Sequence, residues 1–150
     1  MSDVPRYIIA SAAAHFNTIA EELGIPMFVE GQNRDTKLLK AFFELRLDGP
    51  DESRYSGESK YQFMINILIQ VSVDSGYYHR IHEIAGTIAK GFWNFLPIYT
   101  YGDDEITLLE CAQLLKDYKG RDVRIMHYGQ RDIHIRIQQA AVAGQYILTV

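Results

Sequence analysis

The sequence predicts an α+β protein with a mainly antiparallel sheet, a long β-hairpin, and amphipathic helices packed on one face of the sheet. Three patterns predict this fold. Apolar residues fill every odd position from 61 to 73, residues 5–23 and 76–95 each carry an apolar helical stripe, and further alternating stretches lie near the C-terminus. Because strands follow one another without intervening helices, antiparallel pairing is expected. The 150 residues suit one domain spanning 1–150.

The N-terminal part is expected to be a helix over residues 5–23. Ile8 and Ile19 belong to one apolar face at helical spacing. Gly24 follows the last apolar residue and is typical of a helix C-cap. A short strand over residues 27–30 is expected next.

The longest predicted strand covers residues 61–73, which at about 3.3 Å per residue would span roughly 40 Å. The alternation over residues 40–48 predicts a preceding strand with Glu44 on its polar face, ended by Gly49-Pro50. The polar residues 51–59 predict a loop. The two strands together are expected to project beyond the domain as a hairpin arm.

The second half of the chain is predicted to begin with a helix over about 76–95 and a short strand over 97–101. Residues 106–115 are ambiguous. The apolar spacing that ends at Leu115 favours a helix, but Ile106 could equally begin a strand.

Three strands are expected towards the C-terminus. The first two alternate over residues 123–127 and 133–137, with Gly129 near the turn between them. A last strand is expected over residues 146–150.

The composition is that of a globular protein, with 47% apolar and 23% charged residues, so intrinsic disorder is not expected. Its one cysteine, Cys111, cannot form an intramolecular disulfide. The N-terminus does not resemble a signal peptide, and no apolar run approaches the ~18 residues of a membrane helix. The chain is therefore expected to be made in the cytoplasm and to have no membrane partner.

Charge is unevenly distributed along the chain. The formal net charge of −4 argues against a general nucleic-acid binder. Residues 116–136 nevertheless contain six basic and three acidic residues, a net charge of +3. This segment is either a docking surface or, as is more common, a solvated strand face.

Several short motifs resemble catalytic or metal-binding sites, but each lacks a required partner. Tyr101-Gly102-Asp103-Asp104 matches a polymerase palm motif, but a domain of this size cannot hold a template. His79 and His82 share a helix face without further ligands at a diagnostic spacing. His127 and His134 have no catalytic partner at a diagnostic spacing and are expected to be strand-face histidines. Cys111 is expected to be a buried structural thiol. No catalytic, metal-binding or cofactor-binding residue is predicted, and the protein is not expected to be an enzyme.

The most distinctive features are mechanical: the long strand pair, the polar loop, and aromatic residues clustered at 92–95 and at Tyr99 and Tyr101. These aromatic residues fit core filling and interface use about equally. A hairpin that leaves its own domain cannot bury itself and needs a partner, which favours an assembly subunit.

The order of these elements resembles the tail-terminator (neck) proteins of long-tailed bacteriophages. The resemblance covers about residues 6–96. It rests on the first helix ending in Leu23-Gly24-Ile25-Pro26, the strand residues 43–47, the loop with Gly57, and the long strand 61–73 with the helix after it. The basic C-terminal part matches less clearly.

The resemblance implies a virion structural protein of the head–tail joint. Such proteins form a hexameric ring that stops growth of the tail tube and faces the head-side connector or stopper protein, while DNA passes through the lumen without sequence-specific binding. An acidic protein suits this role, because like charge lets DNA slide. The interface residues expected from the loop and the basic segment are Asp51, Glu52, Arg54, Tyr55, Glu58, Arg121, Arg124, Arg131 and Arg136.

Two alternatives stay open. The nearer is another head–tail joint component, such as a head-completion or tube-like protein. The more distant is a small oligomeric enzyme or ligand-binding protein with its site between subunits.

Overall fold

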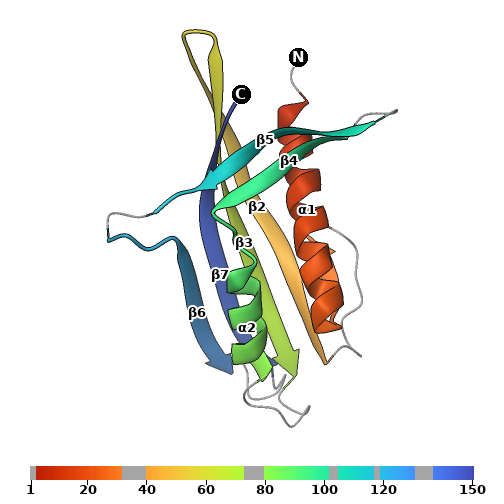
Figure 1. Ribbon diagram of the computed structural model, residues 1–150. Helices are drawn as coiled ribbons and strands as arrows, with labels where there is room; N and C mark the ends of the chain where they lie inside the picture. Colours follow the sequence, from red (N-terminus) through yellow and green to blue (C-terminus); the bar gives the residue numbers. More distant parts are fainter. Residues whose placement is uncertain (1–2, 32–39, 73–79, 102–104, 117–118, 131–136) are drawn as a thin grey trace.

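One curled sheet and two helices make up the part of the chain that the structure, a computed structural model, describes: residues 3–31, 40–72, 80–101, 105–116, 119–130 and 137–150 (Figure 1). The elements are α1 (Val4–Leu23), β1 (Met27–Val29), β2 (Ala41–Tyr55), β3 (Glu58–Ser72), α2 (Arg80–Lys90), β4 (Phe95–Tyr101), β5 (Ile106–Leu114), β6 (Val123–Gln130) and β7 (Ile137–Thr149). The sheet has the strand order β1-β2-β3-β7-β5-β4, with β6 also paired to β7. The β1–β2 pair is parallel and the other pairs are antiparallel. The predicted mixture of helices with a mainly antiparallel sheet is confirmed.

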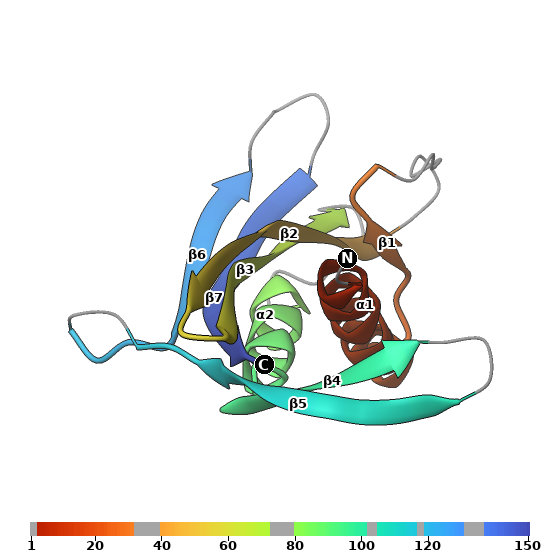
Figure 2. The same cartoon turned by 90° about the horizontal axis from the view of Figure 1, so that it is seen from above.

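The sheet curls around both helices, so that it has a concave face filled by α1 and α2 and an opposite convex face (Figure 2). The odd-numbered side chains of β3 from Tyr61 to Val71 are buried against the helices, as the alternation predicts. Ile8 and Phe16 of α1 and Ile88 of α2 are completely buried in the same core. Each Å² of buried apolar surface contributes about 25 cal/mol of stability, so the packing on this concave face is the main source of stability.

Helix α1 forms where the sequence predicts it. Gly24 ends it in the left-handed conformation, with φ 68° and ψ 28°, and the capping N–H groups reach the carbonyls of Ala20 and Glu21. The buried hydroxyl of Ser11 accepts a hydrogen bond from the backbone N–H of Tyr99 at 2.9 Å. This bond ties α1 to β4.

The predicted end of the second strand at Gly49-Pro50 is wrong, and so is the predicted loop over 51–59. Gly49 and Pro50 form an irregularity opposite Phe63, after which β2 resumes its pairing with β3. The strands meet at Ser56 and Gly57, whose φ angles of 48° and 88° suit a two-residue turn with positive φ at both positions. The polar residues 51–59 indicated a loop. They form strands because backbone pairing between two strands does not depend on apolar side chains.

Glu44 lies on the same face of β2 as Arg46, as the alternation predicts, but it is buried there, with only 3% of its surface exposed. Its carboxylate accepts a hydrogen bond from the Arg46 guanidinium at 2.6 Å. That bond, followed by the attraction of nearby carboxylates, raises the pKa of Arg46. Pairing allows the carboxylate to be buried on the convex face of the sheet.

The second helix is shorter than predicted at its C-terminal end. Its predicted start, near residue 76, lies within residues 73–79, which are outside the described residues. The helix ends at Lys90 rather than at Phe95. Gly91 then packs so closely on α1 that a Cβ there would lie 2.1 Å from Ile19 Cδ1. The chain turns at this point and β4 begins at Phe95, two residues before the predicted strand.

The helix favoured for residues 106–115 is wrong, because Ile106–Leu114 forms strand β5. It pairs with the preceding strand β4 along most of its length and with β7 at Gln113 and Leu114, and this pairing overrides the helical spacing of its apolar residues.

A last strand is present as predicted over residues 146–149, but its predicted start is wrong, since β7 runs from Ile137 to Thr149. The predicted strand 123–127 is β6, and most of the predicted strand 133–137 lies outside the described residues.

Candidate interaction surfaces

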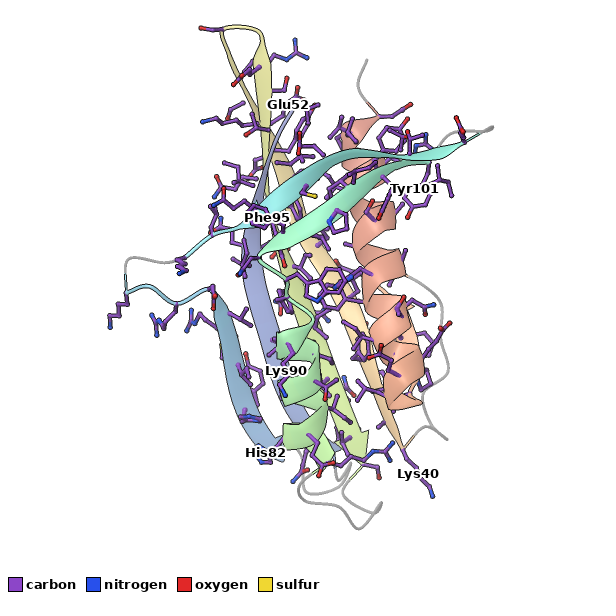
Figure 3. All side chains as sticks on the ribbon, viewed as in Figure 1. Lys40, Glu52, His82, Lys90, Phe95 and Tyr101 are labelled. Carbon is purple, nitrogen blue, oxygen red and sulfur yellow. The ribbon has the colours of Figure 1, made fainter. Side chains whose placement is uncertain are left out.

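The first candidate surface is the β2–β3 tip, defined here as residues 51–58. Figure 1 shows it extending past the helices, and Figure 3 shows Glu52 among its projecting side chains. The predicted interface residues Asp51, Glu52, Arg54 and Glu58 are all exposed on it, while the side chain of Tyr55 is outside the described part. Arg54 and Glu52 form an ion pair at 3.2 Å. Three acids and one arginine give the tip a net charge of −2.

The second candidate is an apolar strip on the outer face of β4 and β5. Strand register places Tyr99 opposite Leu108 and Tyr101 opposite Ile106, and partners in such a pair share a face. Leu108 and Ile106 are 56% and 63% exposed. The strip continues to Phe95 at the start of β4, which is 59% exposed (Figure 3). Clustered apolar side chains of this kind are typical of a surface that meets another protein.

The aromatic cluster divides into buried and exposed members. Phe92 is buried and packs against Phe16, with ring centroids 5.0 Å apart. Trp93 and Phe95 are more than half exposed. Tyr146 donates a hydrogen bond to the Trp93 carbonyl at 2.8 Å, and burial, followed by Asp122, raises the pKa of this tyrosine.

The third candidate is a basic pocket of about 300 Å³ on the convex face. Strands β3, β6 and β7 supply its floor, and the segment between β5 and β6 supplies most of its charged side chains. Two of the predicted interface arginines, Arg121 and Arg124, line it, whereas Arg131 and Arg136 lie outside the described residues. Its complete lining is Met64, Asn66, Leu115, Lys116, Arg121, Asp122, Arg124, Met126, Ala143, Gly144 and Gln145.

Two histidines from distant parts of the chain meet between α2 and β6. The ring centroids of His82 and His127 lie 4.3 Å apart. Desolvation, followed by repulsion from His82, lowers the pKa of His127. The sequence pattern linked His82 to His79 instead, and no sequence signal reports the meeting of α2 with β6. His79 and His134 fall outside the described residues.

The remaining motifs do not assemble into a reactive site in the described part of the chain. Cys111 is half-buried rather than buried, on strand β5. Most of the Tyr101–Asp104 motif lies outside the described residues. Among the residues that are described, no three histidine, cysteine, aspartate or glutamate side chains come together as a potential metal site. Neither described helix is long and apolar enough to span a membrane.

A scan against models of known protein families matches none of them, and a comparison with curated proteins finds no match. The three surfaces are therefore assigned on their geometry and chemistry alone.

Proposed function

We propose that this protein is a virion structural protein, a tail terminator that forms a ring at the head-proximal end of a phage tail tube. The ring stops tube growth and joins the tail to the head-side connector or stopper protein, and DNA passes through its lumen. Its place is the neck of the virion, and each subunit is made in the host cytoplasm.

The observation that carries this proposal is the β2–β3 tip. Its described side chains are exposed and polar, four of them are charged, and none of them belongs to the core. Fifteen residues in each of β2 and β3 exceed the usual strand of about 5–6 residues, although the core needs only their inner parts. We infer that this arm contacts a neighbouring subunit or the tube.

The chemistry of the other surfaces supports the same role. The tip, the apolar strip and the basic pocket are different surfaces, and contacts between unlike surfaces generate closed rings when the rotation suits. The acidic net charge of −4 fits a lumen through which DNA slides without sticking. A second joint component of similar shape would share these features and would differ in its position in the virion.

The direct test is mass photometry of the purified chain, alone and with the tail-tube protein of the same virus, followed by negative-stain imaging. Rings with an open channel, on their own or capping tubes, are expected. A compact dimer or trimer without a channel, with no effect on tubes, would overturn the proposal in favour of a ligand-binding protein or enzyme.

A shortened tip tests the role of the arm. Removing Ser53 and Arg54 together with Ser59 and Lys60 preserves the Ser56-Gly57 turn and the alternation of both strands. We expect a folded subunit, with an unchanged circular dichroism spectrum, that no longer assembles. The matched control, Ser53→Ala with Ser59→Ala, keeps the tip at full length and should assemble normally.

A further inference from the structure

The basic pocket contains a buried hydrogen-bond acceptor. Asn66 lies on β3, where strand register places it between Arg46 of β2 and Ala143 of β7. Its side-chain oxygen is shielded from solvent and accepts no hydrogen bond from the described residues. A buried amide oxygen in this situation favours a ligand that brings an N–H or O–H donor.

The surroundings of Asn66 indicate further properties of that ligand. Met64, Met126 and Ala143 give the pocket an apolar floor. Three basic side chains, Lys116, Arg121 and Arg124, and one acid, Asp122, line it, a net charge of +2. Such a site fits a peptide segment that carries carboxylates and presents backbone N–H groups.

The β2–β3 tip has both of these properties. Its net charge of −2 is equal and opposite to that of the pocket. Beyond Leu45, β2 pairs only with β3 among the described residues, so the other edge of β2 presents backbone N–H and C=O groups outwards. Open strand edges are typical sites for pairing with another chain.

We propose that the β2–β3 tip of one subunit docks in the basic pocket of the next copy of this chain. A backbone N–H of the tip donates to Asn66, and the tip carboxylates pair with Arg124 and its basic neighbours. Because the tip and the pocket are different surfaces, the contact is head-to-tail and repeats around a ring. This inference rests on the proposed function and assigns the subunit interface that the ring requires.

Charge reversal on each side tests the contact. Glu52→Lys with Glu58→Lys reverses the tip, and Arg121→Glu with Arg124→Glu reverses the pocket. Each double variant alone should raise the Kd of self-association by about tenfold or more, because like charges then face each other. Mixing the two variants should restore association to within about threefold of the wild type.

The matched control for the tip is Glu21→Lys with Glu22→Lys, which makes the same charge change on the exposed face of α1. It should leave the Kd unchanged. An equal loss in the control would show that net charge rather than the tip governs association, and would overturn the proposal.

Cross-linking provides a second readout that does not depend on ring closure. In a Cys111→Ser background, Ser53→Cys on the tip is mixed with Lys116→Cys in the pocket lining, and a short bismaleimide is added. A cross-linked heterodimer is expected. Glu22→Cys in place of Lys116→Cys should give none.

The outcomes separate this inference from the proposed function. Rings that survive both charge reversals, without a tip-to-pocket cross-link, would overturn the docking and leave the terminator role standing. A specific cross-link without rings would support the docking and count against the ring. Neither rings nor cross-links would overturn both.

Discussion

The concave and convex faces of the sheet differ in how deeply their side chains are buried. On the concave face, successive odd residues of β3 such as Phe63, Ile65 and Ile67 are at most 1% exposed. On the convex face, the even residues of the same strand include Gln62, exposed, and Asn66, half-buried with an unpaired oxygen. The comparison teaches that the two sides of one strand differ in role: its inner side stabilises the fold, and its outer side carries polar side chains that the core does not use.

The largest expected effect tests the difference between the two faces at two adjacent residues of β3. Ile67→Ala empties a fully buried position on the concave face and should lower the free energy of unfolding by about 3 kcal/mol. Leu68→Ala removes a side chain of the same size from the half-buried convex face and should cost about 1 kcal/mol or less. Urea denaturation measures both, and equal losses would contradict the division between the faces.

A smaller effect on stability is expected at two glycines of the β2–β3 hairpin, Gly49 at the base of the tip and Gly57 at its turn. Gly49 has φ 95°, and a Cβ there would lie 2.9 Å from the Gln62 carbonyl oxygen. Gly49→Ala should therefore destabilise the protein by about 2 kcal/mol. Gly57 has a similar φ of 88° but open space around it, so Gly57→Ala should cost only about 1 kcal/mol. Thermal unfolding of the two variants checks the order, and equal losses would show that crowding at Gly49 is unimportant.

The smallest effect concerns pH and the contact of α2 with β6. The folded-state pKa of His127 is lowered, so the folded protein favours the neutral ring and the unfolded chain binds a proton more readily. This contribution to stability is fully present above the ordinary histidine pKa of about 6.5 and is lost as the pH falls through the lower folded-state value. The melting temperature should decrease over that range, and His127→Asn should reduce the slope. An unchanged slope would mean that His127 does not titrate with unfolding.

Local patterns predicted the concave side of the fold well and the rest less well. The alternation of β3 and the stripe of α1 were visible because each residue's burial follows from the period of its own element. The spacing of Leu108, Cys111 and Ala112 favoured a helix that β4 and β7 convert into strand β5. The extension of β2 past Gly49 could not be predicted, because backbone pairing with β3 does not depend on apolar side chains.

The candidate surfaces show the same limit. The sequence identified the charged tip and the basic segment with Arg121 and Arg124 as separate features. It contained no signal that the arginines would lie beside Asn66, because β3 and the start of β6 are brought together through β7. The contact of His82 with His127 was missed for the same reason.

By itself, the sequence determined the elements whose hydrophobic period matches their own backbone geometry: α1, β1, the inner part of β2, β3 and the body of α2. It also determined where charge is concentrated along the chain. Tertiary structure alone decided that β5 is a strand, that β2 continues through Gly49, and that Asn66, Arg121 and Arg124 share one pocket. The physical reason is that the two strands depend on backbone hydrogen bonds with their partner strands, and the pocket depends on contacts between segments far apart in the chain. The hydrophobic period of a single segment reports neither.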